Sequence, residues 1–277
     1  MATLKQINQE VKEAESLQLI TQAFSDIASL KLKKIRAAVE QNRKFFNEVA
    51  RVYRMVQLVA TQQHKFLKKN NKTILIMLTS NYHFYGNLNR DLINYFVNQT
   101  KVSNYDKIVV GKTGNDFLKG INYNKSYQSI IFKQDLPNDL ELKDLVLRIK
   151  DYQRILVLYS QVKTLLSQIP SIQDITETPL PQNLPKEPLS FIFEPEIEKV
   201  LQFFDGQITS LILEQLFFES ELSRIAARLI SMSEAESNAE GILKSKKRLL
   251  SVAKKNLDNT RYQQNLKKNE ELINLLN

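Results

Sequence analysis

The chain has 277 residues, of which 43% are hydrophobic and 25% charged, and its 39 Lys and Arg against 30 Asp and Glu give a net charge of +9. This composition is that of a globular protein and excludes a wholly disordered chain. Because there is no Cys and there are only two His, disulfide staples, thiolate zinc sites, Cys nucleophiles and an all-histidine metal centre are excluded as well.

Residues 3–68 carry apolar side chains at helical spacing. Leu4, Ile7 and Val11 begin a pattern of steps of three and four that continues through the segment. Neither Gly nor Pro occurs before Gly86, so nothing in the segment breaks a helix. At about 1.5 Å per residue, the pattern predicts a helix about 100 Å long.

The middle of the chain alternates between strand and helix patterns. Apolar runs of the buried-strand type lie at 73–78, 107–110 and 154–159, and candidate edge strands at 128–132 and 189–193. Amphipathic helices are expected at 89–99 and 140–150, and a proline-rich loop or extended connector at 173–188. Strands that alternate with helices predict a small α/β (Rossmann-like) domain.

The last segment, about residues 207–275, has the same helical pattern as the first, and we expect it to be nearly as long. After Pro195 its only breakers are Gly206 and Gly241. Two long apolar stripes can be buried against each other, and antiparallel pairing brings the chain back to its start. We therefore expect an α+β fold, with a long antiparallel α-helical coiled coil of the N- and C-terminal helices (1–69 and 199–277) and an inserted α/β domain (70–198).

The excess positive charge lies mainly on the first helix. Residues 1–69 carry 13 basic and 6 acidic side chains, 70–198 carry 14 of each, and 199–277 carry 12 and 10. The basic clusters Lys31, Lys33, Lys34, Arg36 and Lys244, Lys246, Lys247, Arg248 are candidate phosphate contacts. No aromatic stacking platform alternates with them, so solvated helix faces are the favoured interpretation.

The segment Gly111-Lys112-Thr113 follows a predicted strand and resembles part of a phosphate-binding loop. Such a loop needs a Gly five residues before its Gly-Lys pair, and Asp106 stands there. We expect an ordinary turn from strand to helix at this point.

Other candidates for chemistry lack convergent partners. We interpret the carboxylate pairs Glu194 with Glu196 and Asp135 with Asp139 as solvated turn residues. His83 is interpreted as a structural or partner-contact residue and His64 as part of a solvated helix end.

Several segments, in order along the whole chain, resemble the gamma subunit of F-type ATP synthases. Residues 16–34 are similar to the N-terminal helix of that family, and Ala226-Ala227-Arg228-Leu229 with the following Met232 and Asn238-Ala239 to its C-terminal signature. Residues 79–89, 106–117, 159–170 and 191–195 match its intervening motifs in the same order. The departures are His83, Phe84, Tyr85 and Asn87 in place of Gly, Leu, Cys and Gly, and Phe24 in place of Met.

The resemblance implies a non-catalytic rotor subunit that transmits torque. In the family, the coiled coil is a shaft inside a ring of alternating alpha and beta subunits, while the α/β domain sits at the foot with the epsilon subunit and the membrane-embedded c-ring. The implied location is peripheral, at the cytoplasmic face of a bacterial cell membrane, with no cofactor, no metal, no nucleic acid and no membrane span. The implied torque or partner contacts are Thr21, Phe24, Lys31, Lys34, Gly86, Asn89, Arg228, Met232, Asn238, Leu272, Ile273, Leu275 and Leu276.

Two alternatives stay open on the sequence. The altered loop around Gly86 is compatible with a rotor of an F-type paralogue that has another mechanical role. The basic helices are compatible with a coiled-coil adaptor or a nucleic-acid-binding protein.

Overall fold

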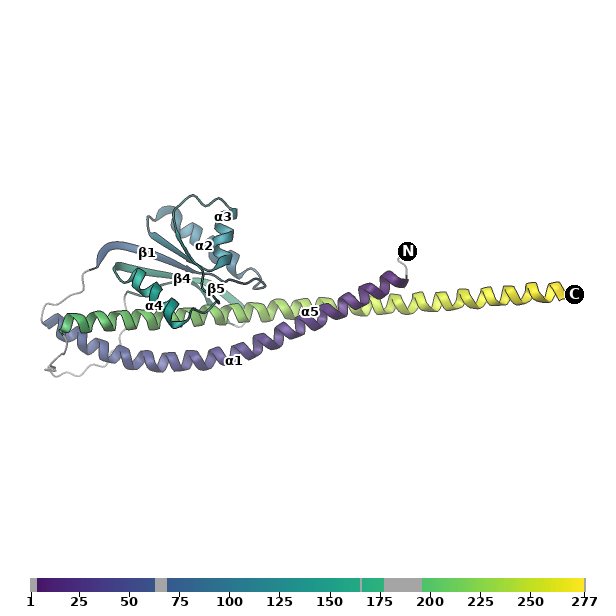
Figure 1. Ribbon diagram of the computed structural model, residues 1–277, viewed down its shortest axis with the longest axis horizontal. Helices are drawn as coiled ribbons and strands as arrows, with labels where there is room; N and C mark the ends of the chain where they lie inside the picture. Colours follow the sequence, from purple (N-terminus) through teal and green to yellow (C-terminus); the bar gives the residue numbers. More distant parts are fainter. Residues whose placement is uncertain (1–3, 63–68, 165, 177–195, 277) are drawn as a thin grey trace. The chain divides into compact units, whose positions relative to one another are not determined.

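The computed structural model describes residues 4–62, 69–164, 166–176 and 196–276, and the side chains of residues 62 and 270–276 lie outside the described part. The elements in chain order are α1 (Leu4–Gln62), β1 (Asn70–Leu78), α2 (Leu88–Val102), β2 (Asp106–Val110), α3 (Lys112–Gly120), β3 (Gln128–Ile130), α4 (Asp139–Ile149), β4 (Tyr152–Thr164), β5 (Ser167–Asp174) and α5 (Ile197–Leu276) (Figure 1). They form two compact units, residues 28–228 and residues 1–27 with 229–277, and both α1 and α5 contribute to each.

The unit of residues 28–228 is built around one five-stranded sheet in the order β3-β2-β1-β4-β5. β1 runs parallel to β2 and β4, β2 runs parallel to β3, and β5 is antiparallel to β4. The three predicted central strands are confirmed as β1, β2 and β4, and β3 confirms an edge strand. The candidate strand at 189–193 lies outside the described residues.

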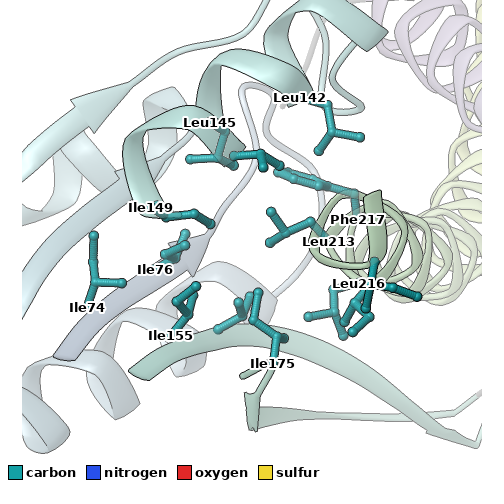
Figure 2. Packing of buried hydrophobic residues seen from close by; sticks show 14 of the residues in the cluster. Ile74, Ile76, Leu142, Leu145, Ile149, Ile155, Ile175, Leu213, Leu216 and Phe217 are labelled. Atoms are coloured by element: carbon teal, nitrogen blue, oxygen red, sulfur yellow. The ribbon is translucent and has the colours of Figure 1, made fainter. Parts of the chain in front are cut away.

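Both faces of the sheet are buried, as is usual for parallel strands. Because side chains alternate along a strand, Ile74 and Ile76 of β1 enter one core and Leu75 and Met77 enter the other. Figure 2 shows the first core, in which side chains of α4 and α5 pack over the sheet. They are Leu142, Leu145 and Ile149 from α4 and Leu213, Leu216 and Phe217 from α5. The second core is closed by α2 and α3, through Leu92, Ile93, Phe96 and Leu118.

The two predicted amphipathic helices of the middle segment are confirmed as α2 and α4. α4 begins at Asp139 because Asn138 and Glu141 form a capping box: the Asn138 side chain accepts from the Glu141 amide, and the Glu141 carboxylate accepts from the Asn138 amide, both at 2.9 Å. The amides of Asn138 and Glu141 at this end of the helix are therefore hydrogen-bonded without any contribution from the sheet.

Within the same unit α1 and α5 pack against each other in antiparallel directions. Asn42 donates to the Glu214 carboxylate at 2.7 Å, and the Tyr53 hydroxyl donates to Asp205 at 2.9 Å. Residue numbers thus fall along α5 as they rise along α1. Together with the inserted sheet, this confirms the expected α+β class.

The second unit is a pair of helical segments, residues 4–27 of α1 and 229–276 of α5. Ile7 and Val11 are buried, and ion pairs join Glu10 to Lys246 at 2.7 Å and Glu15 to Lys247 at 2.9 Å. From residue 254 to residue 269 every side chain of α5 is exposed. This part of α5 is a helix without a covering segment among the described residues.

The expectation of two helices of nearly equal length is wrong, because α1 has 59 residues and α5 has 80. α5 begins at Ile197, directly after the last proline region, and passes through Gly206. A mid-helix Gly costs only about 1 kcal/mol. The buried side chains of Leu201 and Ile208 on either side of it offset that cost.

One strand escaped the sequence patterns. β5 occupies Ser167–Asp174, and its last two residues fall at the start of the segment predicted as a loop or extended connector. The strand is rich in polar residues and contains Pro170. Both features are tolerated because β5 lies at the edge of the sheet, where one side of its backbone needs no partner strand.

Candidate functional site

The residues that directly follow β1 seal the start of α3. Thr79 donates from its hydroxyl to the Val110 carbonyl at 2.6 Å and accepts from the Gly114 amide at 3.0 Å. The amide of Thr113 donates to the Ser80 carbonyl at 2.9 Å. The amide of Lys112 donates to the Asn81 side-chain oxygen at 3.0 Å.

These bonds decide the interpretation of Gly111-Lys112-Thr113. The first amides of a helix bind phosphate only when they are available, and here three of them are already bonded within the chain. The segment is therefore a turn from β2 into α3, as predicted. Gly111 has φ +100°, and a Cβ there would lie 2.6 Å from the Thr79 carbonyl oxygen, so packing accounts for this glycine.

The loop between β1 and α2 carries the residues in which the chain departs from the resemblance. Phe84 and Gly86 have φ of 68° and 54°, in the left-handed region, while Tyr85 between them is buried. Phe84 and His83 are exposed. Asn89 donates to the Ser80 hydroxyl at 2.8 Å and so ties α2 back to the end of β1.

A cluster of buried charges joins this loop region to α5. Arg224 is 2% exposed and donates from Nε to the Glu221 carboxylate at 2.8 Å. The same Nε lies 3.9 Å from Asp135 Oδ2, and the guanidinium also reaches the Asp135 carbonyl at 3.5 Å. Three charged side chains from α5 and the segment before α4 therefore meet out of contact with water.

Tyr85 extends the cluster towards the next turn of α5. Its hydroxyl donates to Asp135 Oδ2 at 2.9 Å, and the Arg228 guanidinium lies over its ring, 4.5 Å from the centroid. Arg228 also donates to the His83 carbonyl at 3.5 Å. Burial, and then the Asp135 carboxylate, raise the pKa of the Tyr85 hydroxyl well above its ordinary value, so the hydroxyl stays a donor.

This cluster corrects one interpretation of the sequence. Asp135 is not a solvated turn residue, because its side chain is 6% exposed and accepts from Tyr85 and from the Asn81 amide. Asp139 does fit that interpretation, being exposed in the first turn of α4. Glu221 and Arg224 were not singled out as functional. The only signal in the sequence is their opposite charges three residues apart, a spacing that places both on one face of a helix.

The remaining predicted contacts divide by burial. Lys31, Lys34 and Asn238 are exposed, whereas Met232 is buried and Phe24 half-buried. Thr21 is also buried, and its hydroxyl donates to the Gln18 carbonyl of its own helix at 2.9 Å. Leu272, Ile273, Leu275 and Leu276 belong to the last turns of α5, and their side chains lie outside the described part, as does His64 altogether.

The described residues offer no cluster of three His, Asp or Glu side chains that could hold a metal ion. Within the same ranges, no helix is both long and apolar enough to cross a membrane.

Comparison with known proteins identifies the family. The family model described as ATP synthase matches residues 3–254, which is most of the chain. The curated relatives that match are ATP synthase gamma chains. The chain belongs to the ATP synthase gamma chain family.

Two bacterial gamma chains show how distant the relationship is. That of Halothermothrix orenii is 26% identical over 264 residues, covering 86% of this chain and 88% of the relative. That of Psychrobacter arcticus is 26% identical over 269 residues, covering 88% and 90%. The resemblance noted in the sequence is confirmed, and the gamma chain is the non-catalytic central-stalk rotor subunit of its enzyme complex.

Two solved structures share the fold. One is the central stalk and c-ring of the Tetrahymena thermophila mitochondrial ATP synthase, with a TM-score of 0.60 and 20% identity over 78% of this gamma chain and 99% of the other. The other is the rotor of the Euglena gracilis mitochondrial ATP synthase, with a TM-score of 0.59 and 18% identity over 91% and 98%. At these identities the likeness shows the fold, long N- and C-terminal helices with an inserted five-stranded α/β sheet.

Proposed function

We propose that this gamma chain transmits torque between a membrane-embedded c-ring and a catalytic hexamer of alternating alpha and beta subunits. An epsilon subunit binds at its α/β sheet. The beta subunits carry out the chemistry, and this chain carries out none. It lies peripherally at the cytoplasmic face of a bacterial cell membrane, a location supported by its bacterial relatives.

The observation that carries the proposal is the continuity of α5. Eighty residues without a proline give a contour length of about 120 Å at about 1.5 Å per residue. A proline inside a shaft would remove a hydrogen bond and kink it. The buried contacts of Asp135 with Arg224 fasten the sheet to this helix, so that the two can turn together.

The exposed charges of α1 supply the surface that a beta subunit pushes. In the family the beta subunit presents an acidic loop there, and the exposed Lys31 and Lys34 complement it. Exposed ion pairs contribute only about 0–1 kcal/mol each. Weak contacts that form and break in turn suit a part that rotates past three partners.

We assign different roles to the other candidates on the coil. The exposed Asn238 contacts the surrounding subunits of the hexamer directly. Thr21, Phe24 and Met232 instead lie beneath the contact surface and determine the shape of the coil there. The apolar tip of Leu272, Ile273, Leu275 and Leu276 turns in an apolar collar of the hexamer. Gly86 and Asn89 set the conformation of the loop that faces the hexamer.

The test is assembly with alpha and beta subunits from the same organism. We expect the chain to co-purify with both and to show no ATP hydrolysis by itself. Reversing Lys31 and Lys34 to Glu should lower the rotation-coupled hydrolysis of the complex severalfold. The matched control reverses Lys112 and Lys119, which are equally exposed on α3 and carry the same change in charge.

Hydrolysis by the chain alone, or failure to co-purify, would overturn the proposed function. Equal effects of the two charge reversals would remove the role given to α1. A steep salt-dependent binding of the chain to DNA or RNA would instead favour the nucleic-acid alternative.

A further inference from the structure

The loop between β1 and α2 contacts α5 through the ring of Tyr85 and the backbone carbonyl of His83. The Tyr85 ring is 4% exposed and lies under the Arg228 guanidinium, which is 4.5 Å from the ring centroid. Arg228 also donates to the carbonyl of His83, two residues before Tyr85. The loop therefore contacts this arginine from both its backbone and its ring.

The other end of Tyr85 is linked to the preceding turn of α5 through Asp135. Its hydroxyl donates to Asp135 Oδ2 at 2.9 Å, and the same carboxylate oxygen lies 3.9 Å from Arg224 Nε. Arg224 is fixed in turn by Glu221 at 2.8 Å. Because Arg224 and Arg228 are four residues apart, they project from the same face of the helix in successive turns. Tyr85 thus links the loop to two turns of α5 at once.

The backbone on either side of Tyr85 is bent to make this possible. Phe84 has φ 68° although it is not glycine, and the residue is 65% exposed to solvent. Gly86 has φ 54°. A left-handed residue with a large side chain is unfavourable by itself and persists only where surrounding contacts fix it. The contacts of Tyr85, the next residue, with Asp135 and Arg228 are of this kind.

We propose that Tyr85 is a positioning residue that holds the Arg228 guanidinium and so clamps the sheet to α5. Through this clamp, torque is transmitted between α5 and the sheet without relative movement of the two. The clamp rests on the proposed function of torque transmission. Ring and cation attract each other most strongly where both are out of water, as they are here. A hydroxyl donated to a buried carboxylate adds a charge-assisted hydrogen bond.

The first test measures the clamp itself, by hydrogen exchange on the full chain. We expect Tyr85→Leu to raise the exchange rates of the amides at 84–86 and 225–229 about tenfold. Tyr85→Phe, which keeps the ring, should raise them less. The matched control is Tyr123→Phe, which removes a hydroxyl bond of 2.8 Å to Thr100 inside the same unit. Adding Arg228→Gln to Tyr85→Leu should raise exchange little further, because both changes remove the same contact.

Exchange in Tyr85→Leu no faster than in Tyr123→Phe would overturn the clamp. So would effects of Tyr85→Leu and Arg228→Gln that simply add.

The second test measures the mechanical role, in the assembled complex in closed vesicles. We expect Tyr85→Leu to lower the membrane potential generated per ATP hydrolysed by more than it lowers the rate of hydrolysis. Tyr85→Phe, which loses only the hydroxyl bond to Asp135, should lower the ratio by less than Tyr85→Leu, and Tyr123→Phe should keep the ratio of the unaltered complex. A Tyr85→Leu complex with an unchanged ratio would overturn the role of the clamp in transmission. Failure of the unaltered chain to support any potential would instead overturn the proposed function.

Discussion

Replacing Arg224 by Met leaves Asp135 and Glu221 buried without the cation that they share. The side chain of Arg224 is 2% exposed, and those of Asp135 and Glu221 are 6% and 7% exposed, so solvent screens the cluster very little. Removing one partner of such a buried group costs about 3–5 kcal/mol. At about 2–4 °C per kcal/mol for a unit of this size, the melting temperature should fall by about 6–20 °C.

Arg148→Met is the matched control. Arg148 makes an ion pair with Asp144 at 2.9 Å, nearly the distance of the Arg224–Glu221 pair, but the two side chains are 44% and 58% exposed. An exposed pair of this kind contributes about 0.3–0.5 kcal/mol. The same substitution therefore separates the effect of burial from the effect of losing an ion pair.

The assay is thermal and urea unfolding of the full chain, followed by far-ultraviolet circular dichroism. Hydrogen exchange of the β1 and β4 amides reports on the sheet-containing unit by itself. A third variant combines Arg224→Met with Asp135→Asn and Glu221→Gln. It should recover most of the loss, because it leaves no unpaired buried charge. A cost for Arg224→Met within about 1 kcal/mol of the Arg148→Met cost, or no recovery in the triple variant, would refute the reasoning.

Gly111→Ala should destabilise the chain by about 1–3 kcal/mol, because it places a side chain at φ +100° and a Cβ 2.6 Å from the Thr79 carbonyl oxygen. Gly120→Ala, which meets no atom within 4 Å, should be neutral or stabilising, and equal urea midpoints for the two variants would contradict the packing argument. Burial raises the pKa of Glu219, because the buried charged form destabilises the folded chain. This destabilisation is absent below the ordinary pKa of Glu and appears as pH rises through the raised value. Glu219→Gln, which keeps a hydrogen-bonding partner for Tyr159, should therefore raise the melting temperature at pH 7 more than at pH 3. A gain that is the same at both pH values would show that the charge of Glu219 is not what matters.

The long helices and the central strands could be predicted because each has a strong local signal. Residues 74–78 form an uninterrupted apolar run, as expected of a strand that is buried on both faces of a sheet. The absence of Gly and Pro before Gly86 allows one helix to continue as far as Gln62. β5 has no such signal, because an edge strand pairs through its backbone and accepts the polar residues and the proline that mark a loop elsewhere.

The buried charge cluster could not be predicted, because its members meet only in the folded chain. Asp135 and Arg224 are separated by 89 residues, and each is a charged residue of the kind usually found exposed to solvent. The motif that carried the resemblance includes Arg228, but a family signature does not say which of its residues are buried. Tyr85 was noticed only as a departure from the family, and its contact with Arg228 on α5 gives that departure a physical reason.

The bonds that Thr79, Ser80 and Asn81 make to the start of α3 also matter for a gamma chain that works beside subunits that bind nucleotides. In the proposed assembly, the neighbouring beta subunits carry out the chemistry on ATP. An open cradle for phosphate in the stalk would sequester a nucleotide and load the rotor with a ligand unrelated to its angle. With those amides committed to the chain's own oxygens, this turn has no free amides with which to cradle the phosphates of a nucleotide.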